Sequence, residues 1–236
     1  HLAQGNGERP VTSLTVLAVA AKASVEQGLE AALESALAHW LYHDEVWLRG
    51  NAKAKAEILL ALARVRHTLV LFGGIVPRKA TTQLRALLND ADAVLLAADT
   101  ADEALFRTEV VGAKLALTEW LVQRGWRPFL NEAGEKKIAG SFKRFADIHL
   151  SRVAAELRSA VQHLAVEDAA DQLPKLSRDI DSVQLLAGAY GDAVAPWLEN
   201  WQELQRAIEH DDRSVFEYFR RQALAAEPFW LHSGKR

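Results

Sequence analysis

Apolar residues recur along this chain at the three- and four-residue spacing of amphipathic helices, and β-branched residues never alternate for long enough to predict a strand. The pattern is densest over residues 56–72, AEILLALARVRHTLVLF, where nearly every side of the predicted helix is apolar. A helix of this kind belongs in the middle of a bundle, so we expect the rest of the chain to pack around it. Its main apolar stripe comprises Ile58, Leu62, Val65, Leu69 and Phe72.

Capping residues and glycines divide the first part of the chain into helices. Ser24 begins a capping box, SVEQ, which predicts a helix from that point to Gly50. Asn51 can cap the next helix, which contains residues 56–72 and should stop at Gly73. Two helices with a short link are therefore expected before residue 74.

Two more helices follow the same pattern. One is predicted from about Lys79 through Leu95. The other starts at Thr100, where TADE forms a second capping box, and runs to Gly125 with Phe106 facing inward. The first half thus predicts four antiparallel helices.

The second half repeats this layout. Residues 126–140 contain Trp, Pro and Gly together with a charged stretch, and we interpret them as the connector between the halves. Helices are then predicted over 141–164, 174–191, 192–210 and 213–225, with Pro174 in the first turn of the second of these. The tail, EPFWLHSGKR, should pack its Phe229 and Trp230 against the fold.

These elements predict an all-α fold of two successive four-helix bundles. The expected domain boundaries are an N-terminal segment 1–23, a first bundle 24–125, a connector 126–140, and a second bundle with its tail 141–236.

Composition narrows the classes of protein to consider. The chain has no cysteine, which excludes disulfides, thiolate metal sites and a cysteine nucleophile. No run approaches the roughly 20 apolar residues of a membrane span, and no signal segment opens the chain, so we expect a soluble protein with no membrane partner. A chain of 236 residues that begins at His1 and lacks methionine is expected to be a fragment of a longer protein.

The charge balance argues against one further class of partner. The chain carries 28 Lys and Arg against 31 Asp and Glu, a formal net charge of −3. A general nucleic-acid-binding protein should have a strong basic excess, so we expect no nucleic-acid partner. Any anion site on this protein must be local.

Several long strings of the sequence resemble a known family in their order. They are GLEAALESALAHWLYHDE, RVRHTLVLFGGIVPRK, ALTEWL, SFKRFADIHLSR, QLPKLSRDIDS and EPFWLHSGKR. Together they resemble the C-terminal helical region of bacterial inorganic triphosphatases, in which a CYTH tunnel domain precedes a CHAD (conserved histidine α-helical) domain. The resemblance covers essentially the whole chain, and the first residues are similar to the end of the CYTH part.

This resemblance implies a cytoplasmic protein with the CHAD fold, two pseudo-symmetric four-helix bundles. It implies that an N-terminal CYTH domain, absent from this chain, is its partner and hydrolyses tripolyphosphate with Mg²⁺ or Mn²⁺. The chain itself is then expected to have no catalytic residue and no cofactor. CHAD domains are associated with binding inorganic polyphosphate through basic residues that line a groove between the bundles.

Only some of the family's basic positions are kept. Arg64 and Arg66, ahead of the Leu-Phe pair, match the later part of the first signature, whereas Ala56 stands at the position of the family histidine and Leu59 at that of the next arginine. In the second half, Lys175 and Arg178 match a similar basic run, but Asp179 and Asp181 lie among them. Acidic groups there oppose a polyanion.

Three sets of basic residues are candidate polyanion ligands, because arginine presents a planar fork to phosphate oxygens and keeps its charge. The alternative is structural, with these residues paired to acidic groups or forming a solvated basic face. The first set is Arg64, Arg66 and His67; the second is Lys143, Arg144, His149 and Arg152; the third is Lys175 and Arg178.

The pair His39 and His43 has the i, i+4 spacing of a possible metal edge. It lacks the glutamate that the zinc-protease motif places beside the first histidine, and spacing places no third ligand, so no metal site is predicted. Lys53, Lys55 and the pair Arg78, Lys79 are interpreted as a solvated rim.

The leading hypothesis is a non-catalytic CHAD module that supports the triphosphatase domain and attracts phosphate polyanions, including tripolyphosphate, into a local basic groove. A first alternative is a dedicated module for binding inorganic polyphosphate. A weaker alternative is a separate metal-dependent enzyme built on His39, His43 or His149.

Overall fold

A computed structural model describes residues 9–231 of the chain. This part is largely helical, and within it there is no strand and a single isolated β-bridge, between Ser24 and Ser141. The prediction of an all-α fold is confirmed. Residues 1–8 of the predicted N-terminal segment and 232–236 of the predicted tail lie outside the described residues.

The chain forms two compact units, which are described separately. Unit 1 contains residues 29–138 and the described part of 1–15, and unit 2 contains residues 16–28 and the described part of 139–236. Both units therefore include a piece of the N-terminal segment. The first helix, α1, begins in unit 2 and continues into unit 1.

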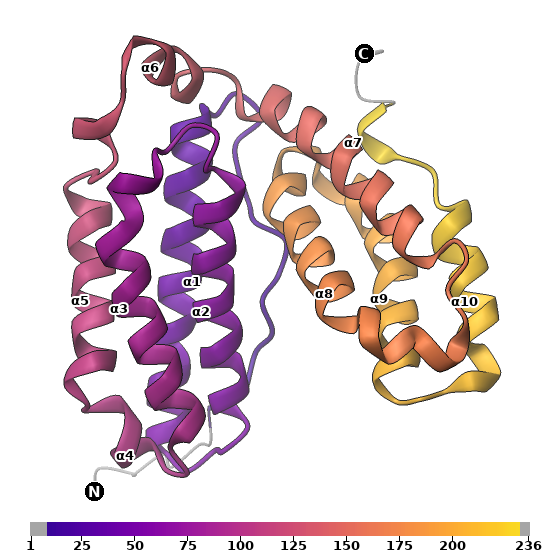
Figure 1. The fold of residues 1–236 in the computed structure, drawn as a ribbon, viewed down its shortest axis with the longest axis horizontal. Helices are drawn as coiled ribbons and strands as arrows, with labels where there is room; N and C mark the ends of the chain where they lie inside the picture. The colour runs from indigo at the N-terminus through magenta and orange to yellow at the C-terminus, as the bar shows by residue number, and fades with distance from the viewer. Residues whose placement is uncertain (1–8, 232–236) are drawn as a thin grey trace, which may run out of the picture. The chain divides into compact units, whose positions relative to one another are not determined.

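Unit 1 consists of long helices that lie side by side, with α3 packed against both α2 and α5 (Figure 1). Its elements are α1 (Val25–Leu48), α2 (Ala54–Leu71), α3 (Arg78–Ala97), α4 (Ala101–Leu105), α5 (Thr108–Val122), the 3-10 turn η1 (Arg127–Phe129) and α6 (Glu132–Ile138).

The predicted apolar stripe of α2 forms part of the core of unit 1. All five of its members, Ile58 through Phe72 at alternating four- and three-residue steps, are buried. The expectation that α2 is surrounded on nearly every side is wrong, because Leu60 is 52% and Val70 is 63% exposed. Helix α2 therefore buries one broad face and leaves another in solvent.

Both predicted capping boxes are present. The Ser24 hydroxyl accepts a hydrogen bond from the amide of Gln27, whose side-chain oxygen accepts one from the Ser24 amide. Thr100 and Glu103 make the same reciprocal pair at the start of α4. Each pair satisfies amides that the first helical turn leaves without a partner.

The predicted helix from Thr100 to Gly125 is interrupted. It is divided into α4 and α5 at Arg107, whose backbone is extended with ψ 141°. Phe106, expected inside, is 69% exposed as a result. The break follows no proline or glycine, so the sequence gives no local reason for it.

Unit 2 contains a second set of long helices, in which α8 packs against α7 and α9, and α9 against α10 (Figure 1). Its elements are α7 (Phe142–Val161), η2 (Val166–Asp168), α8 (Ala169–Leu186), η3 (Ala187–Val194), α9 (Ala195–Glu209), α10 (Arg213–Ala225) and η4 (Phe229–Leu231).

Two helix boundaries in unit 2 differ from the prediction. Pro174 was expected in the first turn, but α8 begins at Ala169 and Pro174 lies inside the helix. At the sixth position of the helix it lies beyond the first turn, so it removes the hydrogen bond that an amide there would donate to the carbonyl four residues earlier. The C-terminal end comes early, at Leu186, and the following 3-10 segment contains Gly191 with φ 58°.

The aromatic side chains of the tail complete the core of unit 2, as expected. Phe229 and Trp230 are buried, and both rings lie against Trp197. The indole N–H of Trp230 donates to the hydroxyl of Ser151 on α7 at 3.0 Å, so its polar atom is satisfied.

None of the helices within residues 9–231 is both long and apolar enough to cross a lipid bilayer.

Candidate functional site

Arg64 is buried and binds the N-terminal segment. Its side chain lies inside unit 1, with the residue only 2% exposed, and Nη1 donates a hydrogen bond to the carbonyl oxygen of Thr15 at 3.0 Å. A buried guanidinium requires such acceptors, because burial without them is costly. One of the two family-like arginines of α2 thus binds backbone of its own chain.

The next candidate, Arg66, makes an ion pair. Its Nη1 lies 2.9 Å from a carboxylate oxygen of Asp92 on α3 and 3.5 Å from the side-chain oxygen of Asn89. This is the arrangement expected for a structural role. His67, the third member of the set, is half-buried on the same helix.

Three side chains from α1 and α2 hold the N-terminal segment in unit 1 through its backbone. The hydroxyl of Tyr42 donates to the carbonyl of Pro10 at 2.9 Å, and the amide of Thr12 donates to Nε2 of His43 at 3.2 Å. Arg64 adds the contact at Thr15 described above. These contacts bind main chain and do not depend on the segment's side chains, so the sequence pattern did not reveal them.

A second group of candidates lies along α7 in unit 2. Lys143 is 3.5 Å from a carboxylate oxygen of Asp147, and its Nζ lies 4.7 Å from the ring centroid of Tyr190, whose hydroxyl donates to Asp147. Arg144 is exposed, and its guanidinium has no hydrogen-bond or ion-pair partner among the described residues. Arg144 is therefore available to a ligand.

Further along α7, His149 and Arg152 contact each other. Nη2 of Arg152 lies 3.1 Å from Nδ1 of His149, and the imidazole lies against the ring of Phe145. Burial lowers the pKa of His149, and the nearby Arg152 charge lowers it further. His149 is therefore neutral at pH 7 and adds no charge to this face.

The third pair of candidates, Lys175 and Arg178, shares one carboxylate on α8. Nζ of Lys175 lies 2.6 Å from one carboxylate oxygen of Asp179, and Nε of Arg178 lies 3.8 Å from the other. Asp179 is buried, so its charge requires these cations. Asp179, which departs from the family pattern, thus lies against Lys175 and Arg178, which match that pattern.

A histidine cluster in unit 1 includes a residue that sequence reasoning missed. Potential ligand atoms of His39, His43 and Glu57 all lie within 4.8 Å of one another. Nε2 of His39 and Oε2 of Glu57 are 2.9 Å apart. No signal in the sequence pointed to Glu57, because the pairing of α1 with α2 that brings it to His39 leaves no periodic pattern along the chain.

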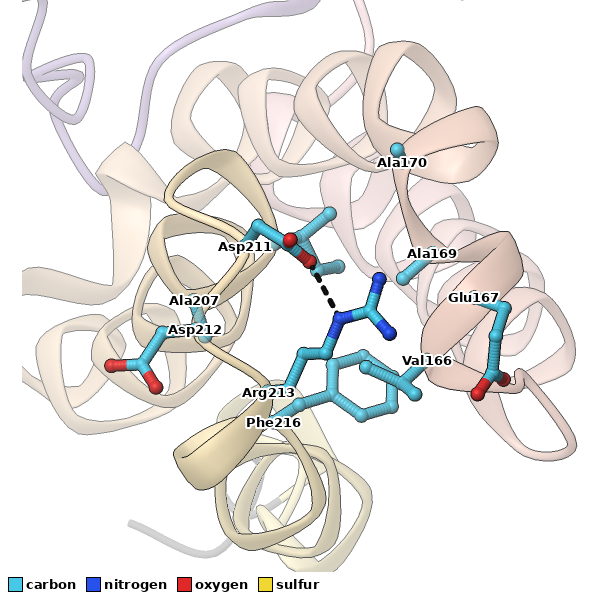
Figure 2. A pocket seen from close by; sticks show the side chains of 10 residues that line it. Val166, Glu167, Ala169, Ala170, Ala207, Asp211, Asp212, Arg213 and Phe216 are labelled. Atoms are coloured by element: carbon cyan, nitrogen blue, oxygen red, sulfur yellow. Dashed lines mark hydrogen bonds and ion pairs between the residues drawn. The ribbon is translucent and has the colours of Figure 1, made fainter.

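A small pocket of about 250 Å³ lies in unit 2 beside η2 and the turn between α9 and α10 (Figure 2). Three acidic residues, Glu167, Asp211 and Asp212, line it together with Arg213, and the carboxylate of Asp212 points away from Arg213 (Figure 2). Arg213 projects into the pocket and is bonded to Asp211 at 3.1 Å, the dashed line in Figure 2. This acidic lining suits no phosphate ligand, and none of the predicted site residues contributes to it.

Comparison with known proteins identifies relatives of this chain. A family model described as CHAD domain matches residues 31–221. Among solved structures, the crystal structure of the CHAD domain from the plant Ricinus communis matches with a TM-score of 0.58 and 17% sequence identity, over 93% of this chain and 91% of that one. At this identity, the structural match is evidence about the fold alone.

Proposed function

The chain belongs to the CHAD domain family, whose model spans most of it, and from this premise we propose a non-catalytic helical module that supports a preceding CYTH-type inorganic triphosphatase domain. The hydrolysis of tripolyphosphate, with Mg²⁺ or Mn²⁺, belongs in this proposal to the CYTH domain. The observation that carries it is the fixation of the N-terminal segment, the part of the chain that would connect the two domains.

The fixed segment suits a structural companion. In unit 1, Tyr42, His43 and Arg64 bind three successive points of its backbone. In unit 2, the amide of Leu17 donates to the carbonyl of Gln184 at 2.9 Å. A flexible linker would be solvated and mobile along its length, whereas a segment tied at these points holds a preceding domain in a defined position.

The state of the family-like arginines favours this module over a dedicated polyphosphate-binding one. Arg64 donates to a backbone carbonyl, and Arg66 is paired with Asp92. A phosphate chain would have to break both arrangements, and the interactions gained would be offset by those lost. Support of the partner domain requires neither change.

A local polyanion surface along α7 is a second candidate function, because Arg144 is exposed and without a partner among the described side chains. The side chain of Arg152, two turns later on the same helix, is 61% exposed; it contacts His149 and lies 3.9 Å from the carboxylate of Glu156. Eight residues span about 12 Å of helix, so both guanidinium groups could contact one extended phosphate chain. Contacts of this kind attract anions electrostatically and weaken with salt.

Thermal inactivation tests the supporting role. In the parent protein with its CYTH domain, Arg64→Ala should lower the temperature at which triphosphatase activity is lost and leave kcat/KM at 25 °C unchanged. The reason is that the variant removes a buried charged hydrogen bond, worth about 2 to 3 kcal/mol. An exposed, ion-paired arginine, Arg206→Ala, serves as the control and should leave the inactivation temperature unchanged. Inactivation at the wild-type temperature in Arg64→Ala contradicts the proposal.

Calorimetry distinguishes polyanion binding along α7 from dedicated polyphosphate binding by the arginines of α2. The chain is titrated with tripolyphosphate and long-chain polyphosphate at low and moderate salt, as wild type, as Arg64→Ala/Arg66→Ala and as Arg144→Gln/Arg152→Gln. We expect salt-sensitive binding that the α7 variant removes and the α2 variant leaves within about twofold. Arg206→Gln/Arg213→Gln carries the same charge change at paired residues and is the matched control. Collapse of micromolar binding in the α2 variant would instead establish a dedicated polyphosphate module.

A further inference from the structure

Two imidazoles and one carboxylate meet inside unit 1, and we propose that His39, His43 and Glu57 form a site for a divalent transition metal of the zinc type. The two histidines come from α1 and the glutamate from the first turn of α2. Nitrogen and carboxylate oxygen are donors that Zn²⁺ and Co²⁺ accept together, commonly as two histidines and one acid with a water in the remaining position.

The spacing of the ligand atoms fits a metal after a small adjustment. Metal bonds of about 2.0 to 2.1 Å in a tetrahedron place neighbouring ligand atoms about 3.3 Å apart. Nε2 of His39 and Oε2 of Glu57 are now 2.9 Å apart, and the three ligand atoms lie within 4.8 Å of one another. The two histidines, one helical turn apart, have ring centroids separated by 4.1 Å. An ion therefore requires shifts of side chains and no movement of a helix.

His43 is already oriented as a metal ligand. Its Nδ1 lies 2.8 Å from the carbonyl oxygen of His39, which can only accept, so Nδ1 carries the proton. Its Nε2 accepts from the Thr12 amide at 3.2 Å, which requires a lone pair there. Two independent contacts thus assign the same neutral tautomer, and a carbonyl that fixes the second ring nitrogen is the usual support of a metal-bound histidine.

His39 needs one rearrangement before it can bind a metal. Its Nε2 lies 2.9 Å from Oε2 of Glu57, a carboxylate oxygen that accepts, so Nε2 carries a proton. Its Nε2–H donates to the Glu57 carboxylate; on metal binding this proton moves to Nδ1, and Nε2 and the carboxylate each donate a lone pair to the ion. Waters that leave the hydrated metal return to solvent.

The neighbouring charges set the strength of the site. Arg64 lies close enough to lower the pKa of His39, and its positive charge opposes a second cation. Glu57 offsets one positive charge only. We therefore expect weaker binding than at structural zinc sites, which have four protein ligands.

Metal binding would also act on the N-terminal segment. The ion takes the Nε2 lone pair of His43 that now accepts from Thr12, and so releases one of the points at which unit 1 holds the segment. The remaining hydrogen bonds to the segment, from Tyr42 and Arg64, involve no metal ligand and stay in place. The site thus links metal occupancy to the attachment of the segment, independently of any polyphosphate binding.

Spectroscopy with Co²⁺ and calorimetry with Zn²⁺ on the chelator-treated full chain test the proposal. We expect one equivalent of metal, visible Co²⁺ absorption bands typical of low coordination number, and at least about tenfold weaker binding in His39→Gln and in Glu57→Gln. His163→Gln, which changes an exposed histidine outside the cluster, is the matched control and should bind like wild type. Circular dichroism verifies that each variant is folded.

A second measurement does not depend on losing a ligand. Zn²⁺ on Nε2 of His43 displaces the Thr12 amide, so that amide should exchange its hydrogen with solvent faster when the site is filled. A purely structural cluster shows no such change. One-equivalent binding that persists in both ligand variants, or the absence of Co²⁺ bands in the wild type, overturns the proposal.

Discussion

Asp179 controls how much positive charge α8 presents to solvent. Its buried carboxylate binds Lys175 on one oxygen and lies near Arg178 on the other. Both cations are partly exposed, so they can attract an anion, and the carboxylate offsets part of that attraction. A single acidic residue thus offsets one of the two positive charges of the family-like basic residues.

The change Asp179→Asn should therefore strengthen polyphosphate binding and weaken the fold. Removal of one negative charge about 6 Å from a bound anion is worth roughly threefold in affinity, and loss of the charged hydrogen bond should cost about 1 to 2 kcal/mol of unfolding free energy. Calorimetry and urea denaturation measure the two effects. Asp171→Asn, at an exposed acid of α8 with no partner among the described residues, should change neither by a comparable amount.

His149 gives a prediction in pH. Its pKa is lowered in the folded protein, so the unfolded chain binds more protons, and stability falls as the pH drops through the ordinary histidine value of 6.5. Arg152→Gln removes one of the two causes, and should raise the pKa of His149 toward its ordinary value. NMR titration of the imidazole measures this directly. An unchanged pKa in the variant would mean that burial alone is responsible.

Among the helices, the close approach of the first turn of α1 to α7 in unit 2 depends on one glycine. A Cβ built on Gly28 would lie 2.1 Å from a ring carbon of Phe142, which is fully buried. The absence of a side chain at residue 28 is therefore what allows the ring to lie against the first turn of α1. In most helices a glycine is a weakness, and here it is a packing requirement.

Gly28→Ala should lower the unfolding free energy by about 1 to 3 kcal/mol, since overpacking outweighs the gain in helix propensity. Gly112→Ala in α5 is the matched control, because a Cβ there meets nothing within 4 Å. That variant should instead stabilise by about 0.5 to 1 kcal/mol. Equal shifts of the same sign in urea denaturation would rule out the packing explanation.

The all-α fold class and the helix caps could be predicted because they depend on local sequence, as the capping boxes at Ser24 and Thr100 show. The break at Arg107 could not be predicted, since no proline or glycine accompanies it. At the candidate sites, the sequence located Arg64 and Asp179 but not the backbone that Arg64 binds, and it found His39 without Glu57. Contacts between distant segments, especially to main-chain atoms, leave no periodic signal in a sequence.

At the scale of the whole molecule, the N-terminal segment belongs to both units. Residues 9–15 are held in unit 1, and residues 16–28 are part of unit 2. In unit 2 Leu17 of the segment and Val25 at the start of α1 are buried, and the amide of Val25 donates to the carbonyl of Gly140 at 2.8 Å. Neither unit is therefore a continuous stretch of chain, and the first turn of α1 belongs to unit 2 while the rest belongs to unit 1.

It follows that a fragment covering residues 139–236 should not reach the stability of unit 2 in the intact chain. It lacks the buried side chains of Leu17, Ala23 and Val25, of which Leu17 and Val25 are worth about 1.5 to 3 kcal/mol each. It also leaves backbone groups of Gly140 and Gln184 without their partners. A fusion of residues 16–28 through a flexible linker to the same fragment should recover cooperative unfolding. Circular dichroism during thermal denaturation compares the two, with Leu17→Ser in the fusion as the control expected to remove most of the recovery. If the fragment alone melts as cooperatively as the fusion, the N-terminal segment only lies on unit 2, and its fixation does not stabilise that unit.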